Sequence, residues 1–228
     1  TVYIPTALCQ FGGATTFFAV QNMGASASDY TVKYFDTTGT NAYTQTVTSV
    51  GGGSKKGFNL CALNSNTQFN GSAVLTGSSP ATVIGKVQDA TNFTSAFLGQ
   101  GSGSAKLAIP FVRWGFSTGD LRSFIAIQNI GASIPAGGIV LTYYNADGSV
   151  FRTCTSLAAT GTSTKVASNV GMGATNATMS CNGSAPTTNW SGSAIITTSA
   201  GPQLIAISRS QGFSAPQITG DINAVFLP

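Results

Sequence analysis

The sequence contains no histidine, no glutamate and few charged residues of either sign. Its 228 residues include ten basic and six acidic side chains, and every acidic residue is aspartate. The absence of histidine excludes Ser-His-Asp and Cys-His catalysis and histidine-ligated metals, and it leaves no side chain whose unperturbed pKa lies near neutrality. We therefore expect a protein that is not an enzyme and needs no cofactor.

Long hydrophobic runs are also missing. A bilayer-spanning helix needs roughly 18 to 20 apolar residues, so we expect no transmembrane segment. Residues 1–5 do not show the basic and then apolar pattern of a signal peptide, so a secreted form would be the mature chain. The basic residues are scattered from Lys33 to Arg209, which argues against a nucleic-acid partner. A mean hydropathy of +0.21 predicts a folded chain.

An internal duplication is the strongest pattern present. Residues 19–26 (AVQNMGAS) match residues 126–133 (AIQNIGAS), and residues 71–76 (GSAVLT) match residues 192–197 (GSAIIT). Between these pairs, Tyr34-Phe35-Asp36 matches Tyr143-Tyr144-Asn145 in the same order. Collinear matches that span residues 19–76 and 126–197 indicate two related halves.

Within each half the hydrophobic period is two, which is typical of strands. Phe18 and Val20 would face one side of a strand and Gln21 the other, and the run Asn145-Ala146-Asp147-Gly148 predicts a hairpin turn. We therefore predict an all-β protein of two tandem antiparallel β-sandwich modules, immunoglobulin-like or jelly-roll-like. The predicted limits are residues 1–100 for the first module, 101–106 for a Gly/Ser linker and 107–228 for the second.

Four cysteines without histidine or a C-x-x-C spacing predict disulfides, and hence an oxidising compartment. The simplest assignment keeps each bridge within one half, joining Cys9 to Cys61 and Cys154 to Cys181. Free buried thiols are the alternative.

Five sequons permit N-glycosylation, so glycoprotein character is an open expectation. They begin at Asn70, Asn92, Asn176, Asn182 and Asn189.

Four other patterns each allow a chemical or a purely structural interpretation. Residues 145–148 faintly resemble the opening of a calcium loop but lack its first Asp and final Glu, so a plain turn is favoured. Residues 51–56 (GGGSKK) lack the spacing of a phosphate-binding loop. The remaining aspartates are isolated, and a hydrolase would need the fold to assemble a pair. Trp114 and Trp190 suggest a sugar-stacking platform or, more simply, core positions. We expect no metal site.

In soluble β proteins, charged residues or proline commonly prevent edge strands from pairing with another chain. The outward positions of this sequence are instead Thr, Ser, Asn, Gln and Gly. Both termini carry a pattern of apolar, any, apolar and proline that also occurs at Leu107–Pro110. This pattern predicts that a terminal segment of one copy adds as a strand to a sheet of the next copy. The alternative is that both terminal segments are ordinary edge strands of their own modules. The candidate contact residues are Val2, Tyr3, Ile4, Pro5, Val225, Phe226, Leu227 and Pro228.

The pattern of Ile109-Pro110, residues 117–119 (STG), residues 124–131 (FIAIQNIG) and residues 142–148 (TYYNADG) is similar to repeats in secreted, largely uncharacterised surface proteins of filamentous and thermophilic bacteria. The resemblance implies an extracellular β-repeat protein and supplies no catalytic residue. Together these features predict a structural subunit that self-assembles into a filament, tube, sheath or surface layer, its partners being copies of itself. The alternative is an adhesin or carbohydrate-binding module with glycan partners.

Overall fold

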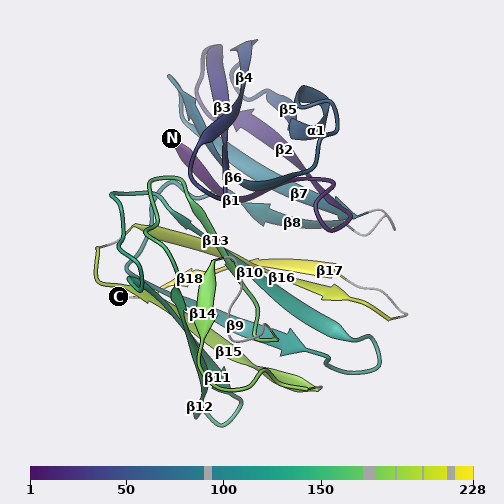
Figure 1. The fold of residues 1–228 in the computed structure, drawn as a ribbon. Coiled ribbons are helices and arrows are strands. Elements are labelled where there is room, and N and C mark those ends of the chain that lie inside the picture. The colour runs from purple at the N-terminus through teal and green to yellow at the C-terminus, as the bar shows by residue number, and fades with distance from the viewer. Residues whose placement is uncertain (90–93, 172–177, 188, 202, 215–218, 228) are drawn as a thin grey trace. The chain divides into compact units, whose positions relative to one another are not determined.

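The computed structural model describes residues 1–89, 94–171, 178–187, 189–201, 203–214 and 219–227, and almost all of its regular structure is antiparallel strand (Figure 1). The predicted all-β fold class is confirmed. The chain divides into two compact units. Unit 1 comprises Thr1–Ser102 with Ser163–Lys165, and unit 2 comprises Gly103–Thr162 with Val166–Pro228. Each unit is described by itself below.

Unit 1 is built from two four-stranded sheets in the orders β1-β6-β3-β4 and β5-β2-β7-β8. A short helix, α1 (Leu60–Leu63), follows β5, and Asn59 caps it by accepting hydrogen bonds from the backbone of Cys61 and Ala62. The strands are β1 (Val2–Cys9), β2 (Ala14–Asn22), β3 (Ser28–Asp36), β4 (Asn41–Val50), β5 (Lys55–Asn59), β6 (Phe69–Gly77), β7 (Ala81–Asp89) and β8 (Thr94–Leu98).

Unit 2 holds a four-stranded sheet in the order β13-β10-β16-β17 and a six-stranded sheet in the order β14-β12-β11-β15-β9-β18. Its strands are β9 (Lys106–Trp114), β10 (Leu121–Asn129), β11 (Ile139–Asn145), β12 (Val150–Ser156), β13 (Lys165–Ser168), β14 (Met179–Cys181), β15 (Trp190–Thr198), β16 (Leu204–Gly212), β17 (Thr219–Asn223) and β18 (Val225–Phe226).

The two units share one strand order. The sheet β1-β6-β3-β4 corresponds to β9-β15-β11-β12, and the sheet β5-β2-β7-β8 corresponds to β13-β10-β16-β17. The matching sequence segments lie on corresponding strands, AVQN on β2 and AIQN on β10, for example. Unit 2 adds β14 beside β12 and β18 beside β9. This common order is what a duplicated sequence is expected to produce, and the duplication itself remains a prediction from sequence.

Alternating burial explains why these segments form strands. Phe18 and Val20 on β2 are buried while Ala19 between them is exposed, and Val32 and Tyr34 on β3 repeat the pattern. A strand directs successive side chains to opposite faces, so this alternation gives each sheet one apolar face. The core of unit 2 is formed in the same way by side chains that include Ile127, Leu141, Tyr143, Ile196 and Leu204.

A buried asparagine explains the repeated Gln-Asn-x-Gly-Ala-Ser segment. Asn22 donates through Nδ2 to the carbonyls of Ser26 and Val50, both at 2.8 Å, and its Oδ1 accepts from the backbone N–H of Gly24. Asn129 has the corresponding contacts in unit 2, donating to Ala132, to Thr160 and to Gly161. Each asparagine thereby holds the loop after its strand and ties it to a distant segment.

In β1 and in its equivalent β9, a proline lies where the pairing with the neighbouring strand shifts register. The pairing of β1 with β6 shifts register between Ile4 and Ala7, around Pro5. The pairing of β9 with β15 shifts around Pro110, between Ile109 and Val112. Because proline has no N–H to donate to a ladder, a bulge is a position where a strand tolerates it. The shared Ile-Pro pattern therefore has a local structural reason in each unit.

Both disulfides are present. Cys9, at the end of β1, is bonded to Cys61 in α1, so the bridge ties the helix to the strand. Cys154 and Cys181 are directly opposite each other on β12 and β14 and are bonded across the two strands. On the loop-entropy model each bridge stabilises the fold by roughly 3 to 4 kcal/mol.

Candidate functional site

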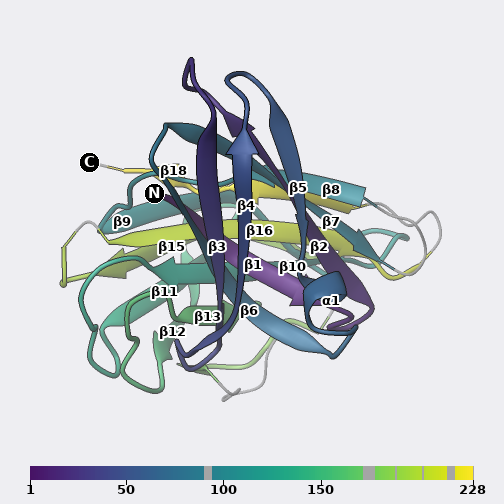
Figure 2. The ribbon, with the colours of Figure 1, turned by 90° about the horizontal axis from the view of Figure 1, so that it is seen from above.

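The candidate site is the set of sheet edges at which another chain could continue a sheet. The longest edge strand among the described residues is β4, which has ten residues and pairs with β3 on one side (Figure 2). Its sequence, NAYTQTVTSV, has no charged residue, no proline and no glycine. Most of its side chains are exposed or half-buried, including Thr44, Thr46 and Thr48. This edge lacks the charges and proline that commonly prevent strand addition, and the two register shifts in its ladder with β3 lie near its ends, which leaves residues 43–47 as a regular stretch.

Unit 2 covers the corresponding edge. There β12 occupies the place of β4, and β14 pairs with its outer side through Cys154, Thr155 and Ser156. The Cys154–Cys181 disulfide holds β14 in place. The edge that is open in unit 1 is thus occupied in unit 2 by a strand of the same chain.

The other edges carry charge or proline or are short. β1 has eight residues and no charge, but Pro5 lies at a register shift in its ladder with β6, and Tyr3 also pairs with Gln100. β5 presents Lys55 and Lys56, both exposed. β17 carries Asp221, which lies opposite Arg209 in the ladder with β16. β8 is neutral and five residues long, half the length of β4. The β4 edge therefore combines length and lack of charge.

The N-terminal candidate residues belong to β1, which pairs with β6 inside unit 1. Val2, Ile4 and Pro5 are buried, and Tyr3 exchanges backbone hydrogen bonds with Gln100 at 2.8 and 2.9 Å. These residues contribute to the core of unit 1, so donating them to a second copy would require this core to open.

The C-terminal candidates are differently placed. Val225 and Phe226 form β18, a two-residue strand paired with β9, and their side chains are 54% and 38% exposed. The N–H of Leu227 donates to the carbonyl of Lys106 at 3.0 Å. Pro228 lies outside the described residues. This segment is held by few contacts and is the more readily released of the two termini.

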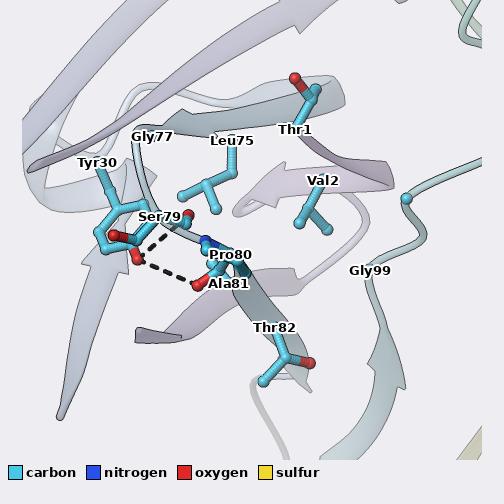
Figure 3. A pocket seen from close by; sticks show the side chains of 11 residues that line it. Thr1, Val2, Tyr30, Leu75, Gly77, Ser79, Pro80, Ala81, Thr82 and Gly99 are labelled. Carbon is cyan, nitrogen blue, oxygen red and sulfur yellow. Dashed lines mark hydrogen bonds between the residues drawn. The ribbon is translucent and has the colours of Figure 1, made fainter. Parts of the chain in front are cut away.

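A hollow of about 270 Å³ opens in unit 1 near the start of β1 (Figure 3). It lies between the ends of the two sheets, and its walls are mainly backbone and small side chains. The lining residues are Thr1, Val2, Tyr30, Leu75, Gly77, Ser79, Pro80, Ala81, Thr82, Gly99 and Gly101. No sequence pattern indicated this hollow, because its lining comes from segments far apart in the chain.

The sequons differ in accessibility. Asn70 is half-buried on β6, between β1 and β3, while Asn182 and Asn189 are exposed. The side-chain oxygens of the exposed pair accept hydrogen bonds from backbone N–H groups, of Thr153 for Asn182 and of Ser117 for Asn189. Asn92 and Asn176 lie outside the described residues.

Neither tryptophan offers an open ring face of the kind that stacks on sugars. Trp190 is buried, and its Nε1 donates to Asn145 at 3.0 Å. Trp114 has the guanidinium of Arg122 4.9 Å from its ring centre. The backbone of Gly171 lies so close to the same indole that a Cβ there would be 1.8 Å from it.

The titratable side chains of the described residues do not gather into a metal site. No group of three or more His, Cys, Asp or Glu side chains is placed to hold a metal ion in the part of the chain that the structure describes. Asp147, in the calcium-like segment, accepts hydrogen bonds from the backbone and side chain of Ser149 within a hairpin turn. Burial raises the pKa of the Tyr34 and Tyr143 hydroxyls, which keeps both neutral.

Comparison of the chain with protein-family models, with curated proteins and with solved structures gives no match. Within the described ranges, no helix is long and apolar enough to cross a membrane. We therefore infer the function from the strands, their edges and their charges.

Proposed function

We propose that the protein is a structural subunit that associates with copies of itself into an extracellular filament, tube, sheath or surface layer. The observation that carries this proposal is the open, uncharged β4 edge. A row of backbone N–H and C=O groups along an edge strand is a template for another strand. The proposal is supported by unit 2, where the corresponding strand β12 pairs with one more strand, β14.

The side chains of β4 favour such a contact. Threonine and valine suit a pleated surface, and neutral hydroxyl groups neither repel an identical neighbour nor cost as much to desolvate as charges do. A second copy that pairs with β4 would continue the sheet across two molecules. We propose a structural rather than a catalytic role on the same basis.

An extracellular location is supported by the two disulfides, which form and persist in oxidising environments. They brace each unit with a covalent link, which suits a protein exposed outside the cell. Because the faces of Trp114 and Trp190 are covered, we do not extend the proposal to carbohydrate binding.

The test is a change of charge on the proposed edge. The double substitution Thr44→Lys and Thr48→Lys places two ammonium groups on β4. Because like charges on two copies repel, we expect self-association to weaken by at least about tenfold. Sedimentation velocity and negative-stain microscopy measure this change. The matched control is Thr76→Lys with Ala19→Lys, because these exposed residues are on the central strands β6 and β2 and do not pair with each other.

Regular assemblies that persist in the control and disappear in the β4 variant would support the proposal. A wild-type protein that stays monomeric at every concentration tested would refute it. Equal loss in both variants would show that the sheet face, rather than its edge, makes the contact.

A further inference from the structure

Unit 1 contains a buried lysine. Lys165 is 5% exposed and ends the segment Ser163–Lys165, which belongs to unit 1. This segment is held against β6, because the hydroxyl of Ser72 donates a hydrogen bond to the carbonyl of Ser163. Lysine is almost never fully buried unless a partner compensates for the lost hydration of its charge. The surroundings of the Lys165 amine therefore need an explanation.

The amine of Lys165 contacts two neutral oxygen atoms. Its Nζ donates to Oδ1 of Asn70 on β6 at 2.7 Å and to Oγ1 of Thr6 on β1 at 3.0 Å. No ion pair joins this amine to a carboxylate in the part of the chain that the structure describes. Burial without a counter-charge lowers the pKa of Lys165 to about 7, so much of the amine is neutral near neutral pH. A neutral, desolvated amine is a nucleophile.

The amine also lies close to an electrophilic carbon atom. A C=O bond is about 1.23 Å long, so Cγ of Asn70 is at most about 3.9 Å from Nζ of Lys165. Reacting atoms in a near-attack geometry are about 3 to 3.5 Å apart, and rotation about the Cε–Nζ bond turns the lone pair toward Cγ. Thr6 and Lys165 are buried, which keeps water from competing with the amine.

We propose that Lys165 and Asn70 form an isopeptide bond within the folded chain. Nζ of Lys165 adds to Cγ of Asn70, the Cγ–Nδ2 bond breaks, and ammonia leaves. One amide replaces another, so the step needs no oxidant, reductant or cofactor. The proton that Nζ loses goes to the departing Nδ2, and the Thr6 hydroxyl, which already accepts a hydrogen bond from Nζ, is its first acceptor. This proposal does not depend on self-association.

A second nucleophile lies beside Asn70. The backbone nitrogen of Gly71 could attack the same Cγ, which would also release ammonia and would leave a succinimide. The sheet opposes this reaction, because Gly71 pairs with Ala7 on β1 and with Asp36 on β3 and its backbone is therefore held extended from both sides. The side chain of Lys165 is not held in a ladder, so its amine has the freer approach.

The bond would have two consequences for the protein. It would close a loop between residues 95 positions apart, and a reductant that opens the two disulfides would leave this loop closed. It would also remove Nδ2 of Asn70, the atom to which an N-linked glycan attaches. Linked molecules therefore cannot carry a glycan at the Asn70 sequon.

The test is mass spectrometry of the reduced, full-length wild-type protein after incubation in mildly alkaline buffer. We expect a mass lower than the sequence mass by one ammonia molecule. After trypsin digestion, residues 57–86 should be joined to residues 153–209, with cleavage after Lys165 blocked. Lys165→Met and Asn70→Ala should each restore the sequence mass and separate the peptides. Lys33→Met, at an exposed position on β3, is the matched control and should keep the link.

Two results would overturn the inference. One is a wild-type protein that keeps its sequence mass after prolonged incubation. The other is an ammonia loss that persists in Lys165→Met, which would assign the reaction to the Asn70-Gly71 backbone. If Lys165→Met does not fold, the presence or absence of the joined peptides in the wild-type protein decides. Assemblies that remain sensitive to the β4 lysines would leave the proposed function standing whichever result is obtained.

Discussion

Asn22 and Val50 are joined by a 2.8 Å hydrogen bond from the buried amide Nδ2 to the backbone carbonyl, across 28 residues of chain. Asn129 makes the same contact to Thr160 in unit 2. Replacing Asn22 or Asn129 by alanine leaves buried carbonyls unsatisfied, so each substitution should destabilise its unit by about 2 to 4 kcal/mol. Urea unfolding followed by circular dichroism measures this, and Asn41→Ala, at an exposed position, is the control. Equal midpoints for Asn129→Ala and the control would contradict the assignment.

Gly71 and Gly192 allow neighbouring strands to approach closely. A Cβ at Gly71 would lie 2.0 Å from the carbonyl oxygen of Phe35, and one at Gly192 would lie 1.9 Å from that of Tyr144. Gly192→Ala must therefore displace backbone, and we expect a loss of several kcal/mol, roughly 3 or more. Gly220→Ala is the matched control on β17, because a Cβ there meets nothing within 4 Å. A thermal midpoint of Gly192→Ala within error of the control would refute this reading.

Removing the Cys154–Cys181 disulfide should create a second open edge. Replacing both cysteines by alanine frees β14 from β12, so we expect lower stability, by roughly 3 to 4 kcal/mol, together with increased and less regular self-association. Removing Cys9–Cys61, which ties α1 to β1 and holds no additional strand over a sheet edge, should lower stability without this gain in association. Light scattering at matched temperatures below each midpoint distinguishes the two effects. Identical scattering would contradict the role of β14 as an edge cover.

Arg152 is a buried cation held by backbone carbonyls. It is 1% exposed, and it donates to Val170 at 2.8 Å and to Asn182 at 3.2 Å. Burial lowers the pKa of its guanidinium, and the hydrogen bonds compensate for the lost hydration. Arg152→Met should destabilise unit 2 by about 2 to 4 kcal/mol, as measured by urea unfolding. The half-buried Arg122, changed in the same way, is the control and should cost less.

Stability should also fall in acid through the hairpin aspartates. Partial burial by itself raises the pKa of Asp36, but hydrogen bonds from Thr38, Thr40 and Gly39 lower it below the ordinary 3.8. A lowered folded-state pKa contributes stability above the unfolded value and loses it as pH falls through the folded value, so the loss begins below about pH 4. Thermal unfolding from pH 7 to pH 2 should show a smaller acid decline for Asp36→Asn than for the wild type. Parallel curves would exclude this contribution.

Much of the fold could be predicted because it depends on local patterns. Alternation at Phe18 and Val20 identifies a strand with one buried face, and Asp147-Gly148 identifies a turn, which the structure closes with a hydrogen bond from Gly148 to Asn145. The cysteine pairs follow from keeping each bridge within one half. The strand and turn signals each lie in a few neighbouring residues, and the disulfide signal lies in the number of cysteines in each half.

The proposed association surface could not be predicted in the same way. Which strand lies at an edge depends on pairings such as β12 with β14, which join segments that no local pattern relates. The hollow in unit 1 is lined by Val2, Leu75 and Ala81 among others, which come from segments far apart in the chain. Likewise, the sequence contains the repeated asparagine, but no local pattern indicates that Asn22 is buried or that it donates a hydrogen bond to the carbonyl of Val50.

Under the proposed function, the disulfide across β12 and β14 links assembly to oxidation. While its thiols are reduced, only the pairing of the two strands holds β14 over the edge of β12. We therefore expect a reductant added during polymer growth to produce branching or disorder where the oxidised protein grows in order.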